Sequence, residues 1–319
     1  MNPPIPAPQL SAALVTFAAD APDDWSSMFA TARMYDRVGI DKLVVSDHVV
    51  FGEHLDAYAN PATGGTAGGR QPTGPDGHWL EPLTTLSVIA GMTERVRLGT
   101  GILLAALRRP VVLAKSAATL DVLSGGRVDL GVGVGWQREE YEAAGLDFDA
   151  RGRLLDDTLA VCRELWTESV VAHHSRFLDF DDIHMMPKPL QEGGVPIWVS
   201  GRVNAAVVRR IGANGRRWIP WGDDATELER SIPELRARLD TEGFPSDDLQ
   251  VVANLRVFTD DDGTVDVART LEPVPAQVAA GATDFLTRFR PRAIDDRFEA
   301  QLQALVDGFR ELTGREPVA

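Results

Sequence analysis

Short runs of β-branched and aliphatic residues recur along this chain, and most are followed by a stretch with the apolar spacing of a helix. The first run, residues 10–17, has the apolar character of a buried strand. Behind it, apolar residues at positions 28, 29, 32 and 35 predict a helix that Asp23 or Asp24 caps and Gly39 ends. This alternation predicts parallel strands connected by helices.

The alternation continues until the chain contains eight strand-and-helix units. The predicted strands are residues 10–17, 41–46, 96–103, 128–134, 195–200, 216–221, 249–258 and 283–287. The later predicted helices lie at residues 81–92, 110–123, 151–166, 204–211, 225–239, within 265–280, and at 295–313. Eight such units predict an α/β fold of one domain, residues 1–319, closed as a (β/α)8 TIM barrel. A doubly wound open sheet is the alternative.

Two segments are longer than the connections of a barrel require, and we interpret them as insertions. Residues 51–79 follow the second strand and are rich in Gly, Thr and Pro, and residues 168–194 precede the fifth strand. Because the first insertion leaves the C-terminal end of a strand, we expect it to cover the mouth, where barrel active sites lie. The adjacent His173 and His174 of the second insertion have no evident partners, and we expect them in a solvated loop.

Composition narrows the classes of protein that remain. The 319 residues include 32 Lys and Arg against 47 Asp and Glu, a net charge of −15. Such an acidic chain is a poor candidate for binding nucleic acid or an anionic membrane, so we expect a small-molecule substrate. The single Cys162 cannot form an internal disulfide, and we expect it to be buried and structural. The first eleven residues carry no positive charge, which favours a cytoplasmic protein over a secreted one.

The ends of the predicted strands indicate where chemistry is possible. The second strand ends in Ser46, Asp47 and His48, which places an acid and an imidazole at the mouth. A histidine in this position can shuttle a proton near neutral pH. The alternative is structural, with Asp47 capping the following loop and His48 packed beneath it. No HExxH, GxSxG or phosphate-loop motif occurs, and we expect no metal site.

Glycines occupy every second position at the ends of the third and fourth strands. They are Gly99 and Gly101 in one strand and Gly131, Gly133 and Gly135 in the other. Glycines in this pattern weaken a strand, so a ligand or another part of the backbone must approach closely. Packing against bulky neighbours is the alternative. No further glycine opens a helix at the spacing of the dinucleotide fingerprint, which disfavours a Rossmann nicotinamide site.

A second polar segment lies at the end of the fifth strand. Ser200, Gly201 and Arg202 come immediately before a predicted helix. Backbone N–H groups at a helix N-terminus bind phosphate well, and an arginine adds a charged donor. We therefore expect a phosphate cradle here, with an ordinary helix cap as the alternative.

Several of these segments occur together in one known family. The chain carries Asp47-His48, residues 96–101, 109–115 and 118–121, Leu123-Ser124-Gly125-Gly126-Arg127, residues 131–136, Glu139-Glu140-Tyr141 and Pro196-Ile197-Trp198. In this order they resemble the bacterial luciferase-like monooxygenase superfamily, and most closely its F420-dependent oxidoreductase branch. The resemblance covers most of residues 10–222. It implies a TIM barrel that binds a flavin or deazaflavin in its C-terminal mouth, usually as a homodimer.

The resemblance also implies roles for individual residues. In such proteins the third strand often ends in a non-proline cis peptide against the tricyclic ring, and the matching bond is Gly101–Ile102. The ring contact after the second strand falls on His48, and the contacts after the fourth strand fall on Val134 to Gln137. The phosphate contacts fall on Ser200, Gly201, Trp221 and Gly222, with Arg202 as an additional contact.

The identity of the general acid departs from the pattern of the family. Deazaflavin-type members often carry a Glu and an Asn at the end of the fourth strand, where this chain has Val134 and Gln137. We therefore take His48, helped by Asp47, as the leading proton donor. The next candidates are Glu139 and Glu140.

These features favour an enzyme that transfers a hydride between coenzyme F420 and a small organic substrate. An FMN-dependent monooxygenase is the alternative, and so is a noncatalytic flavin-binding protein. Because F420 carries a phosphate and a polyglutamate tail, its binding to this acidic protein requires a local excess of positive charge. The arginines expected near the phosphate and after the last strand are Arg202, Arg209, Arg210, Arg216, Arg217, Arg288, Arg290 and Arg292. If they point away from the mouth, FMN is favoured.

Overall fold

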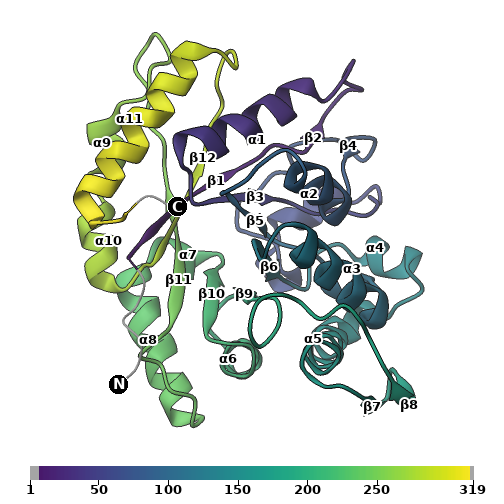
Figure 1. The fold of residues 1–319 in the computed structure, drawn as a ribbon. Helices are drawn as coiled ribbons and strands as arrows, with labels where there is room; N and C mark the ends of the chain where they lie inside the picture. The colour runs from purple at the N-terminus through teal and green to yellow at the C-terminus, as the bar shows by residue number, and fades with distance from the viewer. Residues whose placement is uncertain (1–6, 317–319) are drawn as a thin grey trace.

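The computed structural model describes residues 7–316, and its centre is a closed barrel of eight parallel strands (Figure 1). Around the barrel the strands follow the order β1, β12, β11, β10, β9, β6, β5 and β3. Their bounds are β1 Gln9–Ala13, β3 Lys42–Val45, β5 Arg97–Thr100, β6 Val128–Val132, β9 Ile197–Gly201, β10 Arg217–Pro220, β11 Gln250–Leu255 and β12 Asp284–Arg288. Because β1 pairs with both β3 and β12, the sheet closes, and the predicted (β/α)8 barrel is confirmed.

Helices cover the outside of the barrel (Figure 1). The long ones are α1 Ser26–Val38, α2 Pro82–Ala90, α3 Pro110–Leu123, α5 Arg151–Thr167, α6 Ala205–Ala213, α8 Leu228–Thr241, α10 Val274–Ala280 and α11 Asp296–Thr313. The short ones are α4 Arg138–Ala143, α7 Asp223–Thr226 and α9 Val267–Leu271. At the beginning of α1 the Asp24 carboxylate accepts a hydrogen bond from the backbone N–H of Ser26. Gly39 ends the helix with φ +82°, as predicted.

The predicted first strand is divided into two. β1 ends at Ala13, and the short strand β2, Phe17–Ala18, leaves the barrel to pair antiparallel with β4, His78–Trp79. The rings of Phe17 and Trp79 stack with their centroids 4.2 Å apart. This pairing ties the end of the first insertion to the rim of the barrel. The insertion also contains two turns of 3-10 helix, η1 Leu55–Ala59 and η2 Pro61–Thr63.

Apolar packing is divided between the outside and the inside of the barrel. The larger core lies between the strands and the surrounding helices. The inside holds a small separate cluster made of Val44, Trp198, Val252 and Leu286. Bulky branched residues usually fill the inside of a TIM barrel, but here Gly99, Gly101 and Gly131 line part of it. A cavity therefore remains along the axis.

The second insertion forms a hairpin of β7, Val171–His174, and β8, Asp179–Ile183, rather than a solvated loop. His173 packs against α5, with its Nε2 3.1 Å from Asp157 Oδ1 and its Nδ1 2.9 Å from Glu164 Oε2. His174 is exposed and contacts the hairpin's own carboxylates. The expectation that these histidines lack partners is wrong, because the hairpin folds back on acidic residues of α5.

Cys162 is buried on α5, as predicted, with its Sγ 3.8 Å from the carbonyl oxygen of Pro110. Burial raises the pKa of its thiol, so it remains protonated and unreactive. Within residues 7–316, no helix combines the length and apolar character needed to cross a membrane. Residues 1–6, on which part of the expectation about targeting rests, lie outside the described residues.

Candidate active site

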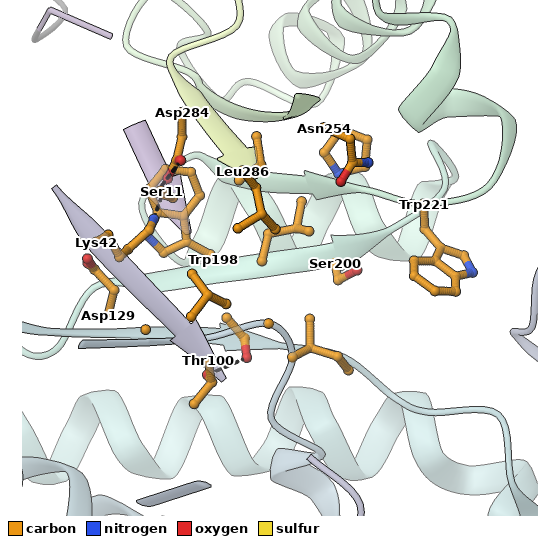
Figure 2. Close-up of a pocket in the computed structure, with 18 of the residues that line it drawn as sticks. Ser11, Lys42, Thr100, Asp129, Trp198, Ser200, Trp221, Asn254, Asp284 and Leu286 are labelled. Atoms are coloured by element: carbon orange, nitrogen blue, oxygen red, sulfur yellow. Dashed lines mark hydrogen bonds and ion pairs between the residues drawn. The ribbon is translucent and has the colours of Figure 1, made fainter. Parts of the chain in front are cut away.

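The cavity inside the barrel has a volume of about 90 Å³ and extends from a polar floor to the mouth (Figure 2). Its floor is formed by Ser11, Lys42, Asp129 and Asp284, near the beginnings or middles of their strands. Its rim is formed by Ser200, Trp221, Asn254 and Arg288, at or just beyond the ends of theirs. Among the residues predicted to contact a cofactor, those that line the cavity are Gly101, Ile102, Ser200 and Trp221.

The glycines of β6 and of the loop after it admit neighbouring parts of the same chain. The peptide bond Gly101–Ile102 is cis, as the resemblance implies. A Cβ at Gly133 would lie 2.4 Å from Cδ1 of Ile102, and one at Gly131 would lie 2.0 Å from the carbonyl oxygen of Thr100. Gly131 is therefore required by the close approach of the backbone at the end of β5, as predicted from the sequence. At Gly133 the neighbour is the end of the Ile102 side chain, which fits the alternative of packing against a bulky residue.

His48 lies just after β3, as predicted, and is enclosed by three segments of the chain. Its Nε2 is 3.0 Å from the side-chain nitrogen of Gln71, which belongs to the first insertion. Its Nδ1 is 3.2 Å from Glu140 Oε1, within ion-pair distance but outside hydrogen-bonding geometry. Phe51 and Trp79 contact the ring, with centroids 4.4 and 4.9 Å away. The side chain is only 10% exposed, so the imidazole is held in one place.

The glutamate that meets His48 is Glu140, not Glu139. Glu140 is 2% exposed, and its Oε1 also accepts the backbone N–H of Val49 at 2.9 Å. Glu139 lies against Gly52, where a Cβ would be 2.4 Å from its Cγ. Consecutive residues of a helix point in different directions, so only one of the two glutamates of α4 reaches the histidine. The sequence did not distinguish Glu140 from Glu139, because the apolar pattern did not predict the helix α4 that carries both.

Asp47 does not contact His48, and its predicted role as a helper is wrong. Its Oδ2 accepts a hydrogen bond from Arg108 Nη1 at 2.6 Å and from the backbone N–H of Leu104 at 2.8 Å. Arg108 also binds Glu81. Asp47 therefore faces the segment after β5, whereas His48 faces Gln71 and Glu140. Asp47 is thus a buried positioning residue for the loop that follows Ile102.

The phosphate cradle predicted at the beginning of α6 is occupied by groups of the chain itself. Asn204 caps the helix, and its side-chain oxygen accepts the N–H groups of Ala206 and Val207. The Asp224 carboxylate accepts the N–H of Val203 at 2.7 Å. An aspartate at this point repels an anion, so the ordinary cap is the correct interpretation. The prediction failed because the helix begins at Ala205 and Asp224 belongs to the next βα connection.

Arg202 contacts the second predicted phosphate segment. A Cβ at Gly222 would lie 2.6 Å from its Nε, so the guanidinium lies directly over that glycine. Its Nη2 is 3.8 Å from Asp223, and 39% of the side chain is exposed. Ser200 and Trp221 face the cavity on the same side of the molecule. Arg202 is therefore a cation that a ligand at the rim can still reach.

The other arginines divide between the two ends of the barrel. Arg288 ends β12 and lines the cavity, where its Nη1 donates to Asn254 Oδ1 at 2.9 Å. Arg210 binds Asp156 of α5. Arg216 and Arg217 lie at the beginning of β10, the end of the strand that is remote from the mouth. The expectation that all of them gather beside the phosphate is wrong for these three, while Arg209, Arg290 and Arg292 are exposed and do not line the cavity.

Gln137 carries an amide group without a partner among the described residues, in the segment that follows β6. It is completely buried, and within residues 7–316 neither its amide nitrogen nor its amide oxygen has a hydrogen-bond partner. A buried unpaired amide is unfavourable unless a ligand or water completes it. The polar edge of a flavin or deazaflavin carries both donors and acceptors, which an amide can match. The preceding Val134 contributes its carbonyl oxygen to the hydroxyl of Tyr141 at 2.6 Å.

The first insertion covers the mouth, as predicted. Tyr58 lies beside Trp136 and Trp221, with ring centroids 5.4 and 6.5 Å away. Trp221 Nε1 donates to the carbonyl oxygen of Gly65 at 3.2 Å. A Cβ at Gly64 would lie 3.0 Å from the carbonyl oxygen of Gly135. The insertion therefore packs on the segment after β6, where the resemblance places the ring.

A closed (β/α)8 barrel with this mouth agrees with the comparison to known families. The model of the luciferase-like monooxygenase family matches residues 8–303, a range that contains every barrel strand. The chain belongs to the luciferase-like monooxygenase family. Membership in this family indicates an oxidoreductase or monooxygenase.

Proteins similar to this chain include one named for F420 and one solved with FMN. An uncharacterized protein of Mycobacterium tuberculosis is 30% identical over 276 residues, which cover 84% of this chain and 88% of the relative. The F420-dependent glucose-6-phosphate dehydrogenase of Kineococcus radiotolerans is 28% identical over 230 residues, 70% of this chain and 61% of that protein. The oxygenating constituent of 3,6-diketocamphane monooxygenase of Pseudomonas putida, solved with FMN, has a TM-score of 0.71 at 14% identity. The match covers 98% of this chain and 100% of that one.

Proposed function

We propose that this luciferase-like protein is an F420-dependent oxidoreductase that moves a hydride between the deazaflavin and a small organic substrate. The observation that carries the proposal is His48, held at the mouth between the Glu140 carboxylate and the Gln71 amide. Coenzyme F420, when bound, supplies the ring carbon that gives or accepts the hydride. The protein must then supply or remove a proton, and a fixed imidazole is suited to that at neutral pH.

The contacts of His48 define how it holds its proton. The side-chain nitrogen of Gln71 faces Nε2, so Nε2 accepts a hydrogen bond. The proton of the neutral ring then sits on Nδ1, which faces the Glu140 carboxylate at 3.2 Å. Gln71 belongs to the first insertion, so movement of that insertion exposes Nε2 to a substrate. In this scheme Glu140 is a positioning residue and His48 is the catalytic residue.

The remaining contacts describe how the chain would hold the cofactor. Gln137 offers an unpaired buried amide to the polar edge of the ring. Ile102 lines the cavity beneath the place where the resemblance puts the ring. Arg202 and Arg288 are the cations near the rim that would attract the phosphate and the acidic tail. The acidic protein thus retains a limited positive region at its mouth.

An FMN-dependent monooxygenase is the second candidate, and one observation favours it. Arg210, Arg216 and Arg217 are directed away from the mouth, two of them bound to Asp156 and Asp248. Fewer cations therefore remain for a polyglutamate tail than the sequence suggested. FMN has a phosphate and no such tail, so its binding requires fewer cationic side chains at the mouth.

Titration of the purified protein with each cofactor separates these candidates. We expect coenzyme F420 to bind at micromolar concentrations and FMN to bind much more weakly, followed by absorbance and fluorescence of the cofactor. Arg202→Gln should weaken F420 more than FMN, because the tail adds negative charge that the arginine attracts. Tight binding of FMN alone contradicts the proposal and supports the monooxygenase. A third outcome is that a cofactor binds but the protein turns over none of the alcohols, aldehydes or ketones supplied. That outcome supports a noncatalytic flavin-binding protein.

A further inference from the structure

The floor of the barrel cavity carries an ion pair that the proposed reaction does not use. Lys42 forms a salt bridge with Asp284, and the two side chains are 6% and 0% exposed. The Lys42 ammonium also lies 4.1 Å from the centroid of the Trp198 ring. Figure 2 shows Lys42, Asp284 and Trp198 gathered at one end of the cavity, with Trp221 at the other. These three residues come from different strands, so the floor is produced by barrel closure.

Hydrogen-bond donors exceed free acceptors on this floor. Asp284 receives hydrogen bonds from Gln9, Ser11 and Lys42, which occupy both of its oxygens. The ammonium of Lys42 has three N–H groups, and among the described residues Asp284 is its hydrogen-bond acceptor. The indole N–H of Trp198 is buried without any partner within residues 7–316. An unpaired buried donor is unfavourable, and an acceptor placed beside Lys42 and Trp198 would complete it.

Both carboxylates on the floor already have cationic partners. Lys42 neutralises Asp284, and Arg97 binds both oxygens of the remaining carboxylate, Asp129, at 2.7 and 3.1 Å. Burial works to raise the pKa of Asp129, but Arg97, Lys42 and the nearby Arg217 outweigh it and hold the pKa below its ordinary value. A cationic ligand would therefore find no free carboxylate here. Burying any further charge behind apolar walls is costly, which favours an uncharged ligand.

The walls between the floor and the mouth are apolar. Val44, Val252 and Leu286 surround the middle of the cavity together with the ring of Trp198. Gly99 and Gly131 line the same cavity and add no side-chain volume to it. The space is therefore narrow, with an apolar middle and hydrogen-bond donors at its inner end.

We propose that the inner half of the barrel is a binding subsite for a slender uncharged molecule whose terminal carbonyl or hydroxyl oxygen accepts hydrogen bonds from Trp198 and Lys42. The apolar walls contact its hydrocarbon part. This inference does not rest on the proposed function, because no group at the mouth takes part in it. The subsite itself requires no cofactor.

The tryptophan indole N–H signals in a proton–nitrogen NMR spectrum test the subsite directly. The probe is 2-pentanone, added to the protein without cofactor, and Trp198→Phe assigns the signal. We expect a saturable shift of the Trp198 indole signal. The Trp166 indole N–H already donates to the carbonyl oxygen of Ala114 at 3.0 Å outside the cavity, so its signal should not move. A Trp198 signal that shows no saturable shift overturns the proposal and leaves a cavity that holds water only.

Variants identify the groups that bind the oxygen. Trp198→Phe keeps an aromatic ring under Lys42 and removes only the N–H, and we expect it to weaken 2-pentanone binding about threefold to tenfold in ligand-observed NMR. Lys42→Met combined with Asp284→Asn leaves the net charge of the floor unchanged and should have a similar effect. If the double variant does not fold, Trp198→Phe alone decides, and unchanged affinity in that variant overturns the proposal. Pentanoate is the charged control, and tighter binding of pentanoate than of the ketone contradicts an uncharged ligand.

The same measurements separate this inference from the proposed function. A saturable Trp198 shift together with absent F420 and FMN binding supports the subsite and contradicts the oxidoreductase. If the cofactor binds and substrate is turned over while the Trp198 indole signal does not shift, the subsite is contradicted and the oxidoreductase is supported.

Discussion

At the scale of single residues, Asp47 and His48 are neighbours with different tasks. The carboxylate of Asp47 turns toward Arg108 and the backbone of Leu104, whereas His48 turns toward Glu140 and the mouth. Proximity in sequence suggested an acid–imidazole pair. The backbone after a strand directs successive side chains to opposite sides, so adjacent residues rarely meet each other.

The role of His48 predicts a specific kinetic loss. We expect His48→Gln to lower kcat about 10²- to 10⁴-fold, the usual contribution of a general acid or base, with little change in cofactor affinity. Glu140→Gln should lower kcat less and alter the pH profile of kcat, since it changes the environment of Nδ1 without removing the imidazole. Steady-state kinetics and cofactor titration measure the two effects. Native turnover in His48→Gln would show that another group moves the proton.

The contacts of Asp47 predict that its substitution lowers stability rather than activity. Asp47→Ala leaves the largely buried Arg108 with Glu81 as its remaining carboxylate, and we expect the free energy of unfolding to fall by about 3 kcal/mol. The matched control is Glu299→Ala, which breaks the exposed pair with Arg37 and should cost less than about 1 kcal/mol. Urea denaturation measures both. If Asp47→Ala loses turnover while its free energy of unfolding is unchanged, Asp47 takes part in the reaction rather than in stability.

At the scale of elements, the first insertion governs access to the site. Tyr58 and Gly64 lie against Trp136 and Gly135, and Trp221 is bound to the insertion through Gly65. The cavity beneath is about 90 Å³, whereas pockets for ligands of this kind measure roughly 300–1,000 Å³. The cavity alone is therefore too small for a tricyclic ring, and we expect the insertion, which packs on the rim residue Trp221, to move when a ring binds.

Hydrogen exchange measures this movement. We expect saturating F420 or FMN to change the exchange rates of residues 55–69 by about tenfold or more, because the contacts with Trp136 and Trp221 are replaced by contacts with the ring. The hairpin of β7 and β8, on a different connection, provides the internal control and should not respond. Unchanged exchange in residues 55–69 with cofactor bound would mean that the ring occupies another place.

The hairpin of β7 and β8 is anchored to α5 through His173. Burial works to lower the pKa of His173, but hydrogen bonds and charge from Asp157 and Glu164 outweigh it and raise the pKa above its ordinary value. Folding therefore favours the protonated ring. The resulting stability is fully present below the unfolded pKa of about 6.5 and is lost as the pH rises through the higher folded value.

Thermal unfolding at several pH values tests this anchor. We expect His173→Gln to lower Tm by about 2 °C or more at pH 6, with a difference that shrinks toward pH 9, where the native ring is neutral. His174→Gln is the matched control, because that side chain is 60% exposed and should have little effect at either pH. A constant difference in Tm between the two pH values would indicate packing rather than protonation.

At the scale of the whole molecule, the acidic surface and the outer helices suggest how copies associate. The chain has a net charge of −15, yet α2 and α3 pack side by side and expose three valines, Val88, Val111 and Val112. Their exposed fractions are 48%, 37% and 62%. The resemblance implies a homodimer, and we propose that its interface includes these exposed valines of α2 and α3. Burying apolar surface there offsets repulsion between two acidic chains.

Light scattering after gel filtration measures the assembly. We expect the native chain to have twice the 34.6 kDa mass of one copy and Val112→Asp to have the mass of one. Leu312→Asp on α11 is the control, because Leu312 is 52% exposed on a different helix. A native chain of 34.6 kDa would contradict the homodimer, and a dimer that survives Val112→Asp would move the interface elsewhere.

Local patterns in the sequence determined the order of the strands and helices, the closed barrel, the two insertions and the placement of His48 and Ile102 at the mouth. Strand and helix periodicity reflect the backbone of each segment, and a barrel then brings the C-terminal ends of all its strands together. Tertiary structure alone decided which side chains meet there. Glu140 rather than Asp47 reaches His48, Asp224 occupies the expected phosphate cradle, and Lys42 meets Trp198 on the cavity floor. Those partners come from segments far apart in the chain, so their meeting depends on packing that no local pattern records.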